Sequence, residues 1–168
     1  MNPTSCASIP SGRDKPGWYA EHDKHVEVAK SSSARVLLLI GNSLIHGLVR
    51  YPKVWNQYFS PLKTLNFGLC GNKIQHVLWR IKNGEITLKA QTIVLHVGTN
   101  NIDRDQPRDI ANGIGSIAVL LQEARPNAKI ILTGLLPRGL QPSIRRMQVD
   151  KVKIFCTIKD FLNFYKCK

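Results

Sequence analysis

The chain has 168 residues, enough for one domain with a substantial core. Its hydrophobic content of 43% and charged content of 21% are ordinary for a globular protein, and no apolar run approaches the ~18 residues of a membrane-spanning helix. The formal net charge is +13, and residues 138–168 alone carry eight basic and two acidic side chains. No nucleic-acid-binding signature accompanies this charge, so a solvated basic helix face is preferred and nucleic acid is not expected as a partner.

Residues 1–17 are rich in Ser, Pro and Gly and lack the apolar stretch of a secretory signal. We expect them to form a disordered N-terminus, followed by a single domain over residues 18–168 that begins with a short helix over residues 18–30. The four cysteines lack metal-ligand spacing and are interpreted as free thiols in a reducing, cytoplasmic compartment. No metal or cofactor is predicted.

Four apolar runs predict buried strands, over residues 36–40, 65–67, 92–97 and 128–132. Amphipathic stretches separate them, and the apolar spacing predicts helices whose buried stripes are Ile74, Val77, Leu78 and Ile81, then Ile110, Ile114, Ile117 and Leu121. Asp105 is expected to cap the second of these helices, with Pro107 in its first turn. A long basic helix is expected to close the chain, with Met147, Ile154, Ile158, Phe161 and Tyr165 on one side. The alternation predicts an α/β fold in which a parallel sheet is covered on both faces, a three-layer α/β/α sandwich.

Loops that bear candidate functional residues follow three of these strands. Gly41-Asn42-Ser43 follows the first, a loop with Gly68 and Gly71 follows the second, and Gly98-Thr99-Asn100-Asn101 follows the third. In a parallel sheet the ligand crevice lies beyond the carboxyl ends of the strands, where these loops would meet. A serine delivered to a helix start is well placed as a nucleophile, although the common role of such a serine is an N-cap.

The ordered set of motifs resembles the SGNH, or GDSL-type, hydrolases, and above all the catalytic subunits of type I platelet-activating-factor acetylhydrolases. The resemblance covers roughly residues 17–153. It rests on Trp18 with His22, Ile40-Gly41-Asn42-Ser43-Leu44, the run over residues 55–85, Val97-Gly98-Thr99-Asn100-Asn101, and the run over residues 128–139.

This resemblance implies a flavodoxin-like strand order, with Ser43 as the nucleophile and with Gly71 and Asn100 as oxyanion-hole donors. It also implies hydrolysis of a short acyl ester, such as an acetyl group on a lipid, without metal or cofactor. Relatives of this type form homodimers or heterodimers and bind a WD-repeat regulatory protein, so these are the partners that the resemblance implies.

Two departures from the family pattern bear on activity. Asn42 stands where the family has Asp. The family's C-terminal Asp-x-x-His is absent, because all five histidines precede residue 97 and the sequence ends near the expected fifth strand. His46 is expected to lean along its helix rather than over the Ser43 hydroxyl, and His76 and His96 are interpreted as structural.

We therefore expect a C-terminally truncated SGNH domain without its last strand and catalytic block, acting as an ester hydrolase of greatly impaired activity. The alternative is a catalytically inactive pseudoenzyme that serves as a dimerisation or WD-repeat-binding module.

Overall fold

The computed structural model describes residues 6–32, 36–86, 89–138 and 143–164, with side chains described from Ala7 as far as Cys156 within those ranges. Its four strands form one parallel sheet in the order β2-β1-β3-β4. The strands are β1 (Val36–Gly41), β2 (Leu65–Gly68), β3 (Ala90–His96) and β4 (Lys129–Leu132). The predicted parallel α/β architecture is confirmed, and the order of these four strands is that of the flavodoxin-like sheet.

Helices connect the strands at the positions that the apolar spacing predicts. The α-helices are α1 (Trp18–Ser31), α2 (Ser43–His46), α3 (Pro52–Val54), α4 (Ile74–Arg80), α5 (Pro107–Ala124) and α6 (Ile144–Phe164). Short turns of other helix types are η1 (Cys6–Ser8), η2 (Gly47–Arg50), η3 (Trp55–Phe59), η4 (Ser60–Leu62), η5 (Ile81–Glu85) and η6 (Thr99–Asn101). Pro52 and Pro107 each stand in the first turn of a helix, where the missing proline N–H leaves no bond unmade.

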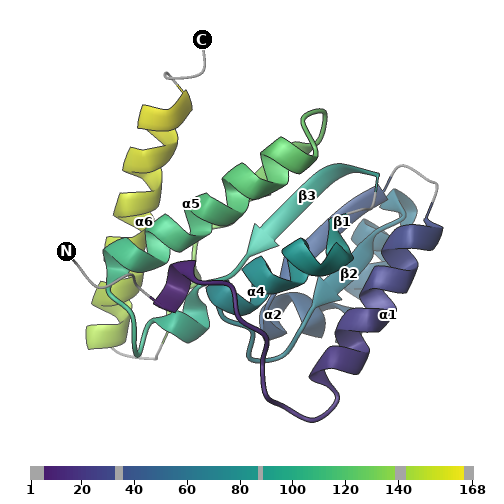
Figure 1. Cartoon of the computed structure of the whole chain (residues 1–168), viewed down its shortest axis with the longest axis horizontal. Helices are drawn as coiled ribbons and strands as arrows, with labels where there is room; N and C mark the ends of the chain where they lie inside the picture. The colour runs from purple at the N-terminus through teal and green to yellow at the C-terminus, as the bar shows by residue number, and fades with distance from the viewer. Residues whose placement is uncertain (1–5, 33–35, 87–88, 139–142, 165–168) are drawn as a thin grey trace.

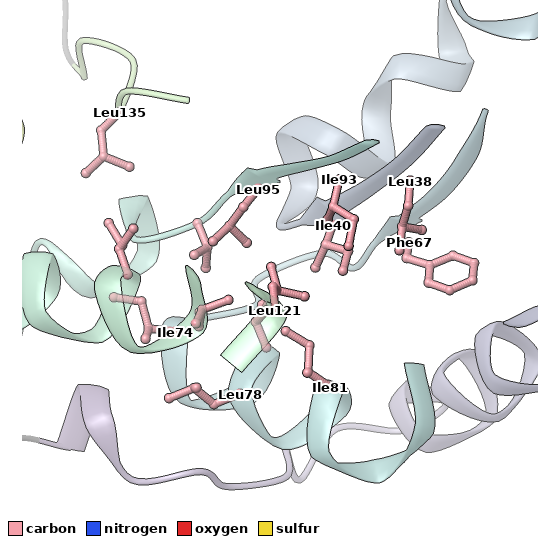
Figure 2. Close-up of a cluster of buried hydrophobic side chains, with 14 of the residues drawn as sticks. Leu38, Ile40, Phe67, Ile74, Leu78, Ile81, Ile93, Leu95, Leu121 and Leu135 are labelled. Atoms are coloured by element: carbon pink, nitrogen blue, oxygen red, sulfur yellow. The ribbon is translucent and has the colours of Figure 1, made fainter. Parts of the chain in front are cut away.

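The main core lies between one face of the sheet and helices α4 and α5, which are in front of the sheet in Figure 1. Figure 2 shows strand residues such as Ile40 and Ile93 facing Leu78, Ile81 and Leu121 of the helical layer. Alternate strand residues point to opposite faces, so Leu39 is buried on the other face of β1. That second face is less completely covered at β4, where Ile131 is 37% exposed.

Residues 6–17 are part of the folded domain, so the expectation of a disordered N-terminus is wrong for this segment. The η1 turn packs against α4 and α5, and Ala7 is fully buried there. The backbone N–H of Ser11 donates to the carbonyl of Gln75 over 3.1 Å. Composition alone suggested disorder, but the small Ala7 side chain fits between two helices. Residues 1–5 lie outside the described residues.

Helix α6 packs on α5, and its buried residues are not those that the sequence pattern groups on one side. Val149 and Val152 are buried, whereas Met147 is 57% and Ile154 is 58% exposed. The helix carries two apolar stripes, and the valine stripe is the one that belongs to the same buried core as Ile114 of α5. The side chains of Ile158, Phe161 and Tyr165 lie outside the described residues.

Candidate functional site

The sheet register brings the three predicted site loops to one edge. Gly41 at the end of β1 is paired with Gly68 of β2 on one side and with His96 of β3 on the other. The N–H of Leu69 donates to the Gly41 carbonyl over 3.1 Å, and the N–H of Asn42 donates to the His96 carbonyl over 3.3 Å. The loops that carry Ser43, Gly71 and Asn100 therefore leave three adjacent strands side by side.

Two glycines at this edge are required by close backbone approach. A Cβ atom at Gly41 would lie 2.2 Å from the His96 carbonyl oxygen, and one at Gly68 would lie 2.2 Å from the backbone nitrogen of His46. Real Cβ atoms do not come so close to backbone atoms. A side chain at Gly41 would thus push β1 and β3 apart, and one at Gly68 would separate α2 from the end of β2.

Ser43 is exposed and is the first residue of α2. The N-cap is Asn42, whose Oδ1 accepts a hydrogen bond of 2.9 Å from the N–H of Leu44. The cap role that a serine before a helix usually fills is thus taken by its neighbour. The Ser43 hydroxyl therefore does not act as the helix cap, and a nucleophilic hydroxyl must not be used in that way.

The second loop presents Gly71 in the left-handed backbone region, with φ of 72°. The guanidinium of Arg13 lies against its Cα and donates to the carbonyl of Cys70. A side chain at Gly71 would be strained by the positive φ and would also collide with Arg13. Residues of the N-terminal segment therefore contact the loop that holds one of the predicted oxyanion donors.

The third loop joins the second through a side-chain amide. Asn100 is half-buried, and its Nδ2 donates to the carbonyl of Asn72 over 2.8 Å. An amide nitrogen carries two hydrogens, so one N–H of Asn100 remains for another acceptor. The bond fixes the orientation of the side chain that the sequence predicts as an oxyanion donor.

The neighbouring Asn101 is fully buried and ties the same loop to the start of α4. Its Oδ1 accepts from the N–H of Ile74 over 3.1 Å, and its Nδ2 donates to Gln75 and, over 2.8 Å, to the carboxylate of Asp105. The prediction that Asp105 caps α5 is wrong, because the N-cap is Gln106 and makes no side-chain cap bond. The carboxylate is used instead to orient Asn101.

Beneath the loops lies a buried ion pair that sequence reasoning missed. Arg80 and Glu85 are both 0% exposed and form a two-point contact, Nε to Oε1 at 2.9 Å and Nη2 to Oε2 at 2.7 Å. Burial by itself would raise the pKa of Glu85, but Arg80 together with His22 and His25 lowers it to about 2. The available sequence signal was a basic residue inside the apolar stripe of a helix, with an acidic residue five positions later.

In each of the five histidines one ring nitrogen contacts a partner other than Ser43. The Nδ1 atoms of His22 and His25 lie 3.0 Å and 3.2 Å from Glu85 Oε1. His46 Nδ1 lies 3.2 Å from the carbonyl of Gly68. His76 accepts from the N–H of Lys73, and His96 contacts Thr133 Oγ1 at 2.7 Å. Burial lowers the pKa of His96 and, with nearby basic groups, that of His76 to about 4.

In the part of the chain that the structure describes, no helix has the length and apolarity needed to cross a membrane. A scan of the sequence against models of known protein families finds no match.

Curated relatives of the chain are subunits of one type of hydrolase. It is 41% identical over 136 residues to the platelet-activating factor acetylhydrolase IB subunit alpha2 of Homo sapiens, covering 80% of this chain and 58% of that protein. It is 39% identical over 127 residues to the alpha1 subunit of Homo sapiens, covering 75% of this chain and 54% of that protein. The chain thus spans a little more than half the length of the curated relatives that it matches.

Solved structures show the same fold. A GDSL-like lipase from Bacteroides thetaiotaomicron has a TM-score of 0.62 at 20% identity, over 88% of this chain and 73% of that one. Axe2, an acetylxylan esterase from Geobacillus stearothermophilus, has a TM-score of 0.58 at 19% identity, over 79% and 74%. The chain is thus similar in sequence to the acetylhydrolase subunits over most of its own length, and it shares the fold of the GDSL-like lipase and of the acetylxylan esterase.

Proposed function

We propose that the chain is a serine ester hydrolase in which Ser43 is the nucleophile. The oxyanion donors are the backbone N–H groups of Ser43 and Gly71 and the side-chain amide of Asn100. The observation that carries this proposal is the hydrogen-bonded meeting of three strand-end loops at one sheet edge, next to an exposed serine that is not the N-cap of its helix.

In the proposed reaction, the Ser43 oxygen attacks the ester carbonyl and forms a tetrahedral intermediate. The negative charge on the former carbonyl oxygen is stabilised by the oxyanion donors, each of which typically contributes ~10²–10³ in rate. The alcohol leaves, and water then hydrolyses the acyl-enzyme. The names of the relatives favour a short acyl group, acetyl on a lipid alcohol, as the substrate class.

Turnover by this 168-residue chain is proposed to be slow, because among the described residues no hydrogen bond joins any of its five histidines to Ser43. All five have a ring nitrogen engaged with partners other than Ser43. Loss of a triad base can lower kcat by ~10⁶ and still leave ~10³–10⁴ over water from the oxyanion hole and binding. The free thiol of Cys70 supports a reducing, cytoplasmic location as part of the same proposal.

A second candidate function is a dimerisation or WD-repeat-binding module. The observation that favours it is the exposed apolar stripe of α6, made by Ile144, Met147 and Ile154. An apolar stripe of this kind on a surface helix is a candidate interface with another protein. The relatives are themselves named as subunits, which fits a second copy, a related chain or a WD-repeat protein as the partner.

The test compares the chain with its Ser43→Ala variant. A fluorophosphonate probe should label the chain at Ser43, and p-nitrophenyl acetate hydrolysis should be slow and disappear in Ser43→Ala. Equal hydrolysis rates in the two proteins would reject the hydrolase proposal. Binding to a WD-repeat protein without any fluorophosphonate labelling would favour the second candidate.

A further inference from the structure

We propose that the buried Arg80–Glu85 pair is a positioning element that fixes the three site loops relative to one another, and that helix α1 completes it through His22 and His25. The effect of this pair on catalysis rests on the proposed function, whereas its effect on the geometry of the loops is independent of that function.

The guanidinium of Arg80 contacts the ends of two strands and the loop that follows the second. Its Nη2 donates to the carbonyl of Phe67 over 2.6 Å, and its Nη1 lies 3.5 Å from the carbonyl of Gly41. The same Nη1 donates to Asn72 Oδ1 over 3.3 Å. Gly41 is two residues before Ser43, and Asn72 directly follows Gly71. One planar group therefore sets the spacing between the nucleophile loop and the oxyanion loop.

The third loop is attached through the same asparagine. The carbonyl of Asn72 accepts from Asn100 Nδ2 over 2.8 Å, while its side-chain oxygen accepts from Arg80. A rotation of the guanidinium would therefore displace Asn72, and with it the acceptor that orients Asn100. Arg80 is thus linked by two hydrogen bonds to Asn100, by one to the residue after Gly71 and by one to Gly41, two residues before Ser43, although it lies below the surface.

Glu85 holds this guanidinium in one orientation. The two-point contact with Nε and Nη2 matches the fork of arginine to the plane of a carboxylate, which a single contact would not do. Both side chains are fully buried, so loss of either charge leaves the other without compensation. The carboxylate thus determines how the arginine meets the strand ends.

Helix α1 supplies the remaining contacts of the carboxylate. His22 Nδ1 lies 3.0 Å from Glu85 Oε1, and His25 Nδ1 lies 3.2 Å from the same oxygen and 3.2 Å from Arg80 Nη2. The His25 ring also stacks on Phe67, with centroids 4.4 Å apart and planes at 7°. A helix that precedes the sheet in the chain is in this way coupled to the end of β2.

A buried ion pair can also serve only to hold a core together, and the experiment separates the two roles. Peptide-resolved amide hydrogen exchange is measured over residues 41–44 and 68–73, together with the rate of fluorophosphonate labelling at Ser43. The variants are Glu85→Gln, which keeps the shape of the side chain and removes its charge, and Arg80→Lys, which keeps the charge and removes the fork. The control is Leu121→Ala, which opens the core at a fully buried position of α5. All proteins are measured at a temperature at which tryptophan fluorescence shows each to be folded.

Both variants should accelerate exchange in the two segments about tenfold or more and slow Ser43 labelling by a similar factor, whereas Leu121→Ala should do neither. If both variants fail to fold, His25→Phe provides the test, because it keeps the ring that stacks on Phe67 and removes the nitrogen near Glu85. It should accelerate exchange in the same two segments by a smaller factor. Exchange that matches the Leu121→Ala control in the folded variants would overturn the inference. An unlabelled wild-type Ser43 would reject the proposed function, while the exchange data would still decide the role of Arg80.

Discussion

Replacement of His76 by glutamine should remove a loss of stability that the wild-type chain shows in mild acid. His76 is the third residue of α4, is only 9% exposed, and accepts a hydrogen bond of 3.1 Å at Nδ1 from the N–H of Lys73. Burial lowers its pKa from 6.5 to about 4, with help from the positive charges of Arg13, Lys73 and Arg80. The folded protein therefore keeps this ring neutral at a pH where the unfolded chain protonates it.

The sign and size of the effect follow from this difference in pKa. Between pH 6.5 and pH 4 the unfolded state binds one more proton at this residue, so the free energy of unfolding falls as the pH falls. Above pH 6.5 the titration of His76 takes nothing from the free energy of unfolding, and at pH 4 it has taken its full amount. One pKa unit corresponds to about 1.4 kcal/mol, so the loss is about 2–3 kcal/mol once partial solvent screening is allowed for.

Glutamine is the matched replacement, because at this helix position its side-chain oxygen can accept the same backbone N–H and it does not titrate. Urea unfolding followed by tryptophan fluorescence at pH 7.5, 5.5 and 4.5 measures the free energy of unfolding of both proteins. His76→Gln should lie within about 1 kcal/mol of wild type at pH 7.5 and decline less by about 2–3 kcal/mol at pH 4.5. Parallel pH dependences in the two proteins would refute this account of His76.

Other substitutions test the architecture of the site. Gly41→Ala should destabilise the chain by roughly 3 kcal/mol, because its Cβ would meet the His96 carbonyl, whereas Gly134→Ala, with open space at its Cβ, should stay within about 0.5 kcal/mol in urea unfolding. Asn42→Ala should cost about 1 kcal/mol in the same experiment, because the N-cap bond to Leu44 is lost, and an unchanged midpoint would contradict the assignment of that cap. The pKa of Glu85 is held at about 2 instead of 4.5, so acid unfolding should steepen below pH 4.5 and cost about 3 kcal/mol by pH 2, and a flat profile there would be inconsistent with the buried pair.

Much of the fold could be predicted from the sequence, because the signals involved are local. Apolar runs and helical spacing located the four strands and helices α4 and α5 within a few residues. Glycines and prolines marked the turns, and the rule that ligand crevices lie at the carboxyl ends of parallel strands placed Ser43, Gly71 and Asn100 on neighbouring loops. None of these inferences needs to know which residues distant in the chain will touch.

The tertiary structure alone decided which distant groups meet. Glu85 pairs with Arg80 and with two histidines about 60 positions away, and nothing in the local sequence of α1 indicates that partnership. The same holds for Ala7 between two helices and for the valine stripe of α6. Periodicity shows that a side chain can be buried, but the cost of burying a charge or leaving a gap depends on the partner, which only packing supplies.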